Sequence, residues 1–291
     1  MKLLCATDLL PETDSALERS GFLSDSLGAT LTLLHVVAPG APHGRTDHER
    51  LGEIRASLIA RTSAPDWRWK SRPDVVVLPG SPAQLLIETA EGQDAGLMIL
   101  GPHRVDAFAD SVRSTITEQV LSSATCPVLI ARKEVTGGYR QVLIALDGSP
   151  ASAGLLQVVE TFALAKEGSA TVVHAHTPHY EGMMNTVGVG AESIARYAAT
   201  TRDQAAENLK ELLAAHSADA HRYRIAVVDG QPARTILHAL QSLQADLVVL
   251  GTRGHGRIRR ALLGSVAIDV LRGAQCDVLL VPGAALAAAS R

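Results

Sequence analysis

The sequence has 291 residues, of which 46% are hydrophobic and only 3% aromatic, and its formal net charge at pH 7 is −3. This near-neutral balance provides no basic field for nucleic acid or an anionic membrane, and no apolar run reaches the roughly 18 residues of a membrane span. The three cysteines are too few for a disulfide framework and Asp8 comes too early for a signal peptide, so we expect a cytoplasmic protein that binds neither nucleic acid nor membrane.

Apolar runs that predict strands alternate along the chain with segments that predict helices. Several of the expected helices begin at proline or at a small polar residue, as at Ser81-Pro82 and Gln231-Pro232. This alternation predicts a parallel, doubly wound sheet with right-handed crossovers. The strands are expected near residues 2–8, 30–37, 73–78, 96–101 and 127–131, and again near 141–146, 170–176, 222–228, 246–251 and 277–281.

The chain repeats itself once. Residues 3–18 are answered by 142–157, and residues 125–132 by 275–282. Such a long period indicates a duplicated domain and not a solenoid. We therefore predict two α/β domains, at 1–136 and 139–291, joined through Gly137-Gly138. The second copy is longer, and its additional residues are assigned to 177–191, either as a flap over a ligand or as a surface loop.

One loop of the second copy carries the strongest chemical signal. It reads GTRGHGRIRRALLGSV from Gly251 to Val266 and follows an apolar run typical of a buried strand. Its glycines allow backbone N–H groups to approach a ligand closely, and Gly264-Ser265 comes at the start of an expected helix, where the dipole favours an anion. Arginines between the glycines add positive charge. The pattern predicts a phosphate-binding loop that is neither a Walker loop nor a dinucleotide turn.

The spacing of this loop, G-x2-G-x9-G-[ST], resembles the ATP-binding signature of the universal stress protein family. The resemblance covers nearly the whole chain, twice. It implies two tandem five-stranded parallel doubly wound domains (Rossmann-like, related to the adenine-nucleotide α-hydrolases) and a stress-response or signalling role. It also implies ATP or another adenine nucleotide as ligand, with Mg²⁺ carried by the nucleotide. Domains of this family mostly pair through their last strands, so a homodimer is left open and the protein partner is unknown.

The resemblance also assigns residues to the nucleotide. Asp147 matches the acidic residue that contacts the nucleoside, although D-G-S-P also fits an Asx turn or a helix cap. Ala175 matches the strand position whose backbone reads the adenine edge, and Leu250 would pack under the nucleoside. The phosphates and ribose would be contacted by Gly251, Arg253, Gly254, Gly264, Ser265 and Val266. Arg257, Arg259 and Arg260 are interpreted mainly as a solvated surface.

The first copy departs from the signature. Arg104 replaces the second glycine, Ser114 replaces the third, and Pro102 removes a backbone donor, while Thr115 and Asp8 remain. The Arg104 side chain would fill the space for phosphate. We therefore predict that the first domain has a degenerate loop and that nucleotide binding belongs to the second domain.

Other chemistry has weaker support. His174, His176 and His179 form an H-x-H-x2-H pattern that fits either zinc or packing, and packing is favoured because His35 occupies the place of His174 in the first copy. No residue is assigned as catalytic or as a metal ligand, and no general base is positioned for fast ATP hydrolysis, although slow turnover is left open. Two alternatives remain: a protein-interaction scaffold that binds no nucleotide, and an ATP-using enzyme of the adenine-nucleotide α-hydrolase fold, whose S-G-G-x-D-S loop this chain lacks.

Overall fold

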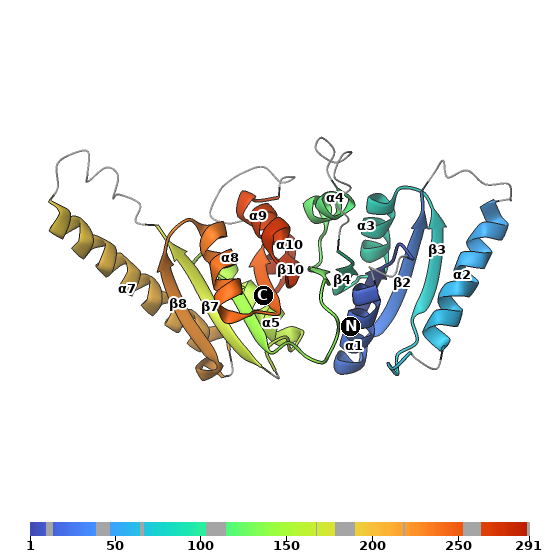
Figure 1. Cartoon of the computed structure of the whole chain (residues 1–291), viewed down its shortest axis with the longest axis horizontal. Coiled ribbons are helices and arrows are strands. Elements are labelled where there is room, and N and C mark those ends of the chain that lie inside the picture. The colour runs from blue at the N-terminus through green and yellow to red at the C-terminus, as the bar shows by residue number, and fades with distance from the viewer. Residues whose placement is uncertain are drawn as a thin grey trace. The chain divides into compact units, whose positions relative to one another are not determined.

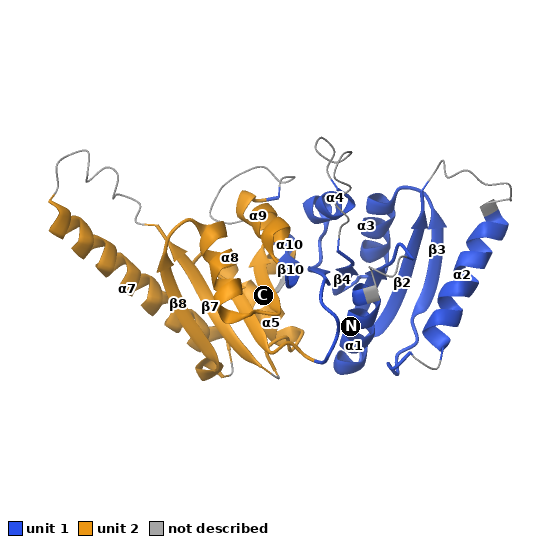
Figure 2. Ribbon diagram, viewed as in Figure 1, with its two compact units in different colours: residues 1–137, 258–263, 275–284 blue, residues 138–257, 264–274, 285–291 orange. Residues whose placement is uncertain are grey.

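The computed structural model describes residues 1–9, 14–38, 47–64, 67–102, 115–166, 168–177, 190–217, 219–252 and 263–289. Two compact units make up the chain (Figure 2). The first unit contains residues 1–137 together with 275–284 from near the C-terminus, and the second begins at Gly138. A short segment at the end of the second sequence copy therefore belongs to the first unit.

The sheet of the first unit has the strand order β3-β2-β1-β4-β5, and these five strands are parallel. β10 is added beside β5 and runs antiparallel to it. The strands are β1 (Lys2–Ala6), β2 (Thr30–Val37), β3 (Asp74–Pro79), β4 (Leu97–Leu100), β5 (Val128–Ile130) and β10 (Asp277–Val281).

The sheet of the second unit has the order β9-β6-β7-β8, again with parallel pairing. The chain adds β7 and β8 on one side of β6 and then places β9 on the other, so the predicted doubly wound α/β fold is confirmed. The strands are β6 (Gln141–Ala145), β7 (Ser169–His176), β8 (Tyr223–Asp229) and β9 (Leu247–Gly251).

Helices cover both sheets (Figure 1). In the first unit α3 packs beside α4, and in the second α8 packs beside α9. Proline occupies the first position of α3 and of α8, where its missing N–H has no intrahelical partner to lose. The helices are α1 (Asp14–Leu27), α2 (Asp47–Ser63), α3 (Pro82–Gly92), α4 (Ile116–Ser123), α5 (Ala151–Thr161), α7 (Ala191–His216), α8 (Pro232–Leu243), α9 (Ser265–Gly273) and α10 (Gly283–Ala289), with a 3-10 turn η2 (Ala220–Arg222).

The interior is aliphatic, as the composition predicts. Helices lie on both faces of each sheet, so the central strands are continuous apolar runs and not alternating ones. The largest fully buried side chains are Leu3, Leu4, Leu33, Leu34, Leu97, Met98, Ile99, Leu129, Ile130, Leu143, Ile144 and Leu156. None of the helices that the structure describes is both long and apolar enough to cross a bilayer. Most of the predicted flap or loop at 177–191 lies outside the described residues.

Candidate functional site

The carboxyl ends of β6, β7 and β9 meet at one edge of the second unit. Ala145, the last residue of β6, pairs with Val173 of β7 on one side and with Leu250 of β9 on the other. The strand order reverses here, and doubly wound sheets bind ligands beyond the carboxyl ends of their strands at such a point. Asp147 and Gly251, which are far apart in the sequence, both follow directly from this edge.

The backbone of β7 is directed alternately to its two neighbours. The Leu146 N–H donates to the Val173 carbonyl over 3.0 Å, and the Gly230 N–H donates to the His176 carbonyl over 3.1 Å. Backbone polar groups of alternate strand residues point to the same side, so Ala175, like Val173, directs its N–H and C=O toward β6. Because β6 has already ended at that level, these groups face the region beyond its carboxyl end. A ligand edge placed there can be read by the backbone alone.

Asp147 closes a tight turn at the end of β6. Its Oδ1 atom accepts the Ser149 N–H at 2.9 Å and the Ser152 hydroxyl at 3.3 Å. Gly148 between them has a φ of +74°, a conformation that favours glycine. The Asx turn that the sequence allows is therefore present, and it fixes the carboxylate at this edge. Sequence reasoning did not identify Ser152. Its hydroxyl is the second donor to Asp147 Oδ1, and no local sequence motif indicates this bond.

His174 and His35 make the same contact in the two copies. The Nδ1 atom of His174 lies 2.9 Å from the Leu146 carbonyl, and that of His35 lies 2.8 Å from the Thr7 carbonyl. A carbonyl only accepts, so Nδ1 carries the proton in both rings. Both histidines tie the second strand of their copy to the end of the first, which is the structural role that the sequence favours.

His176 is also held by the protein. Its Nε2 atom lies 3.0 Å from the Thr201 hydroxyl of α7, and its side chain is buried. His179, the third histidine of the pattern, lies outside the described residues. Across the part of the chain that the structure describes, no three His, Cys, Asp or Glu residues are grouped so as to hold a metal ion.

The glycine loop begins and ends at one point of the fold. The Gly264 N–H donates to the Thr252 carbonyl over 2.8 Å, and Thr252 is only 2% exposed. The end of β9 and the start of α9 are thereby joined, and Leu250, the fourth residue of β9, is buried with an exposed fraction of 3%. Several predicted residues of this loop lie outside the described residues: Arg253, Gly254, Arg257, Arg259 and Arg260.

The start of α9 has no side-chain cap. Gly264 is the N-cap residue and contributes no side chain, and the first turn carries no acidic residue. Ser265 is exposed and Val266 is half-buried at the first two helical positions. The first N–H groups of a helix have no intrahelical acceptor, and their combined dipole attracts an anion. The arrangement therefore presents backbone donors and a hydroxyl at the end of β9, beside the turn that holds Asp147.

The corresponding helix of the first copy is capped by its own side chains. The Thr115 hydroxyl accepts the Glu118 N–H at 3.1 Å, and a Glu118 carboxylate oxygen accepts the Thr115 N–H at 3.3 Å. Glu118 also places a negative charge in the first turn of α4. A phosphate would meet competition for the donors and electrostatic repulsion there. The replacements at Arg104 and Ser114 themselves lie outside the described residues.

The sequence profile described as "Universal stress protein family" matches residues 1–132 and 138–282. The chain belongs to this family. Each match covers one sequence copy, so this universal stress protein carries the domain twice in tandem.

Known relatives match either one copy or both. A universal stress protein of Thermus aquaticus is 33% identical over 144 residues, which are 49% of this chain and 98% of the relative. A universal stress protein of Mycobacterium tuberculosis is 25% identical over 269 residues, which are 86% of each chain. Among solved structures, a universal stress protein from Archaeoglobus fulgidus superposes with a TM-score of 0.67 at 18% identity, over 97% of this chain and 96% of that one. That structure shares the tandem fold.

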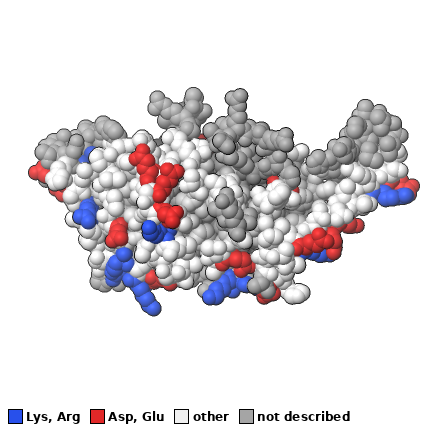
Figure 3. Space-filling view, turned by 180° about the vertical axis from the view of Figure 1, so that it is seen from behind, with Lys and Arg blue, Asp and Glu red and all other residues white. Residues whose placement is uncertain are grey.

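Among the described residues, the buried cysteines Cys5 and Cys126 are not activated thiols. Burial raises the pKa of Cys5 to about 12 and that of Cys126 to about 11, so both thiols are neutral at physiological pH. Cys276 is also buried and forms no disulfide bond. On the face that Figure 3 shows, basic and acidic side chains of the described residues are interspersed, without a broad basic surface. That face gives no support to a nucleic-acid partner.

Proposed function

We propose that this universal stress protein binds ATP, with Mg²⁺ on the nucleotide, in its second copy and acts as a nucleotide-dependent stress-response or signalling module in the cytoplasm. The observation that carries the proposal is the uncapped start of α9 joined to the end of β9. Thr252 and Gly264 hold these two ends together, and neither an acidic side chain nor a side-chain cap occupies the first turn. A phosphate group supplies the negative charge that this turn lacks.

The nucleoside would lie along the carboxyl edge of the sheet. Asp147 would accept hydrogen bonds from the ribose hydroxyls, because its turn holds the carboxylate at this edge. The N–H and C=O of Ala175 would read the adenine edge beyond the end of β6, and Leu250 would support the nucleoside from below. Purine recognition by the backbone is consistent with the absence of any special side chain at position 175.

The phosphates would extend toward α9. Gly264, Ser265 and Val266 supply N–H groups and a hydroxyl, while Gly251, Arg253 and Gly254 would complete the loop around the phosphoryl oxygens. No described group of carboxylates is arranged to hold Mg²⁺ by itself. The ion would enter bound to the triphosphate, which is how proteins commonly take up this metal.

The test is equilibrium binding of ATP and AMP, with and without Mg²⁺, measured by isothermal titration calorimetry. The variant Gly254→Arg places in the second copy the residue that the first copy has, and we expect it to weaken ATP binding at least about tenfold because the side chain fills the phosphate space. AMP has only one phosphate, so the substitution should reduce AMP affinity less than ATP affinity. Arg104→Gly is the matched control in the first copy and should leave ATP affinity unchanged.

Two results would overturn the proposal. Undiminished ATP affinity of Gly254→Arg would exclude the second-copy loop as the phosphate site. Absence of any nucleotide binding by the unaltered protein would favour the interaction scaffold. Phosphate release measured alongside binding separates a nucleotide sensor from an enzyme with slow turnover.

A further inference from the structure

The strands β5 and β10 are the same element of the two sequence copies. They pair antiparallel, with Leu129 opposite Leu279 and with Val128 opposite Leu280. Leu129 and Leu279 are themselves equivalent positions, since residues 125–132 repeat as 275–282. A strand that pairs with its own equivalent forms the local two-fold arrangement of an isologous interface. Backbone pairing alone therefore does not determine which copy joins which.

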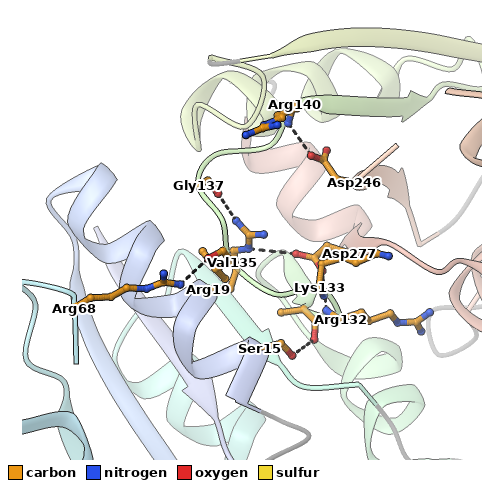
Figure 4. A network of polar contacts seen from close by, with 11 residues as sticks. Ser15, Arg19, Arg68, Arg132, Lys133, Val135, Gly137, Arg140, Asp246 and Asp277 are labelled. Atoms are coloured by element: carbon orange, nitrogen blue, oxygen red, sulfur yellow. Dashed lines mark hydrogen bonds and ion pairs between the residues drawn. The ribbon is translucent and has the colours of Figure 1, made fainter. Parts of the chain in front are cut away.

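A buried ion pair accompanies this strand pairing. The Nε atom of Arg19 in α1 lies 3.2 Å from Oδ2 of Asp277, the first residue of β10, and the two side chains are 4% and 0% exposed. Figure 4 shows the two side chains pointing toward each other beside the segment that follows β5. Arg19 also donates from Nη1 to the Gly137 carbonyl over 3.0 Å.

The second oxygen of Asp277 is bound to the end of β5. Its Oδ1 atom accepts the N–H groups of Arg132 at 2.7 Å and of Lys133 at 2.9 Å (Figure 4). Charge-assisted bonds of this length are the strong kind. The carboxylate of Asp277 in β10 is thus bound both to α1 and to the segment that follows β5, and it is not exposed to water.

The ion pair is absent from each copy taken alone. The equivalent of Arg19 in the second copy is Val158, and the equivalent of Asp277 in the first copy is Pro127. A pair of two first copies would place Arg19 against proline. A pair of two second copies would place Asp277 against valine. In both cases a buried charge would lose its counter-ion, which is strongly destabilising.

We propose that the Arg19–Asp277 pair selects which copies join. It makes the β5 edge of a first copy accept the β10 strand of a second copy and reject the like strand of another chain of the same protein. The strands provide the affinity, and the one-sided charge pair provides the discrimination between two nearly equivalent partners.

The experiment uses the full chain with a protease site inserted between Gly137 and Gly138. The folded protein is cleaved there, so that both fragments are present in equal amounts but are no longer tethered, and the mixture is brought to equilibrium. Native mass spectrometry then counts unlike pairs and both kinds of like pair. Without the tether, the distribution reports pairing preference and not effective concentration.

We expect unlike pairs in the cleaved unaltered protein to exceed each like pair at least about tenfold. Arg19→Val should raise like pairs of the first fragment only, and Asp277→Asn, which keeps an Oδ1 acceptor, should raise like pairs of the second fragment only. The double variant should approach the statistical distribution, with unlike pairs about twice as abundant as each like pair. Arg68→Ala is the control: it alters a neighbouring arginine that forms its ion pair with Glu18, and it should leave the distribution of fragment pairs unchanged.

The inference fails if the unaltered fragments already pair statistically, if they do not pair at all, or if both single variants keep the unaltered distribution. Circular dichroism of each full chain before cleavage shows whether it has folded. Arg19→Val tests like pairs of the first fragment, and Asp277→Asn tests like pairs of the second fragment. If one variant misfolds, the other still provides a complete test.

Discussion

The Thr115 hydroxyl accepts the Glu118 N–H at 3.1 Å, and the Glu118 carboxylate accepts the Thr115 N–H at 3.3 Å. The equivalent positions in the second copy are Ser265 and Ile268, and the first turn of α9 contains no acidic residue. The first copy therefore supplies an anion to its own helix, whereas the second copy leaves that place for a ligand. The N-cap also shifts by one position, from Thr115 before α4 to Gly264 before α9, so the second copy has no side chain at the capping position.

Placing a carboxylate in the second copy should separate stability from binding. We expect Ile268→Glu to weaken ATP binding at least about tenfold, because the new charge repels the phosphates, while the unfolding free energy changes by only about 1 kcal/mol because the helix dipole favours the same charge. Ile268→Gln is the neutral control of the same size and should retain most of the affinity. Calorimetry with ATP and urea denaturation measure the two effects; equal losses of affinity in both variants would contradict the electrostatic explanation.

The Asp147 carboxylate should contribute to both the turn and the ribose contact. Asp147→Ala removes the bonds to the Ser149 N–H and the Ser152 hydroxyl, and we expect a loss of about 1 kcal/mol of stability, which is typical of an intramolecular hydrogen bond. We also expect the unaltered protein to prefer ATP over 2′,3′-dideoxy-ATP and the variant to bind both equally. Ser149→Ala retains the carboxylate and should behave as the unaltered protein. A variant that still discriminates against the dideoxy nucleotide would show that another group reads the ribose.

Much of the fold could be predicted because its signals are local. Apolar runs bounded by glycine and proline located the ten strands of the described residues, with bounds that differ from the observed ones by at most two residues. The repeat then fixed the tandem organisation, since two copies of one pattern imply two copies of one fold. The 26 residues of α7 and the short α10 were not predicted as such.

The features that could not be predicted from the sequence depend on contacts between residues that are far apart in the chain. The bonds from Arg132 and Lys133 to Asp277 join residues that are 145 and 144 positions apart, and no spacing rule relates these positions. Likewise, T-x-x-E at Thr115 is a capping box that the sequence reveals. That this box would compete with phosphate for the first N–H groups of the helix is apparent only from comparison with the uncapped start of α9. The nucleotide contacts assigned to residues 251–266 remain predictions, to be decided by the binding experiments.

The two arginines near the linker should differ in their effect on stability. Arg19→Leu leaves the Asp277 carboxylate buried beside an apolar side chain, and we expect a loss of about 3–5 kcal/mol. Arg68 forms its ion pair with Glu18 on the surface, where the side chains are 51% and 33% exposed, so Arg68→Ala should lose about 1 kcal/mol or less. Urea denaturation followed by tryptophan fluorescence reports this directly, because both tryptophans lie in the first unit. Similar losses in the two variants would show that burial of the pair is not what matters.

The buried thiols should make the protein less stable in alkali. Burial raises the pKa of Cys5 from 9.0 to about 12 and that of Cys126 from 9.0 to about 11. Above the ordinary pKa the unfolded chain loses these protons while the folded chain retains them, so the unfolding free energy falls by up to about 1.4 kcal/mol per pH unit for each thiol. Denaturation curves from pH 8 to pH 10.5 measure the slope. In the variant with alanine at both positions, the unfolding free energy should fall less steeply with pH. An unchanged slope would show that the loss of stability comes from other titratable groups.

Two glycines inside helices should respond oppositely to alanine. A Cβ on Gly21 of α1 would lie 2.6 Å from Cγ and 2.9 Å from Nε1 of Trp69. That ring is held in place, since its Nε1 donates to Glu18 over 3.1 Å and the ring makes a T-shaped contact with the ring of Phe22. We therefore expect Gly21→Ala to lose about 1–3 kcal/mol and to change the tryptophan fluorescence of the folded state.

The matched control is Gly52 of α2, whose added Cβ would meet no atom within 4 Å. Gly52→Ala should gain about 0.5–1 kcal/mol, because alanine restricts the unfolded chain and favours the helix, and it should leave the fluorescence of the folded state unchanged. Urea denaturation and emission spectra of the two variants make the comparison. A gain of stability in both would mean that Trp69 moves aside without loss, and that the packing of residues 67–73 against α1 is looser than the short contacts imply.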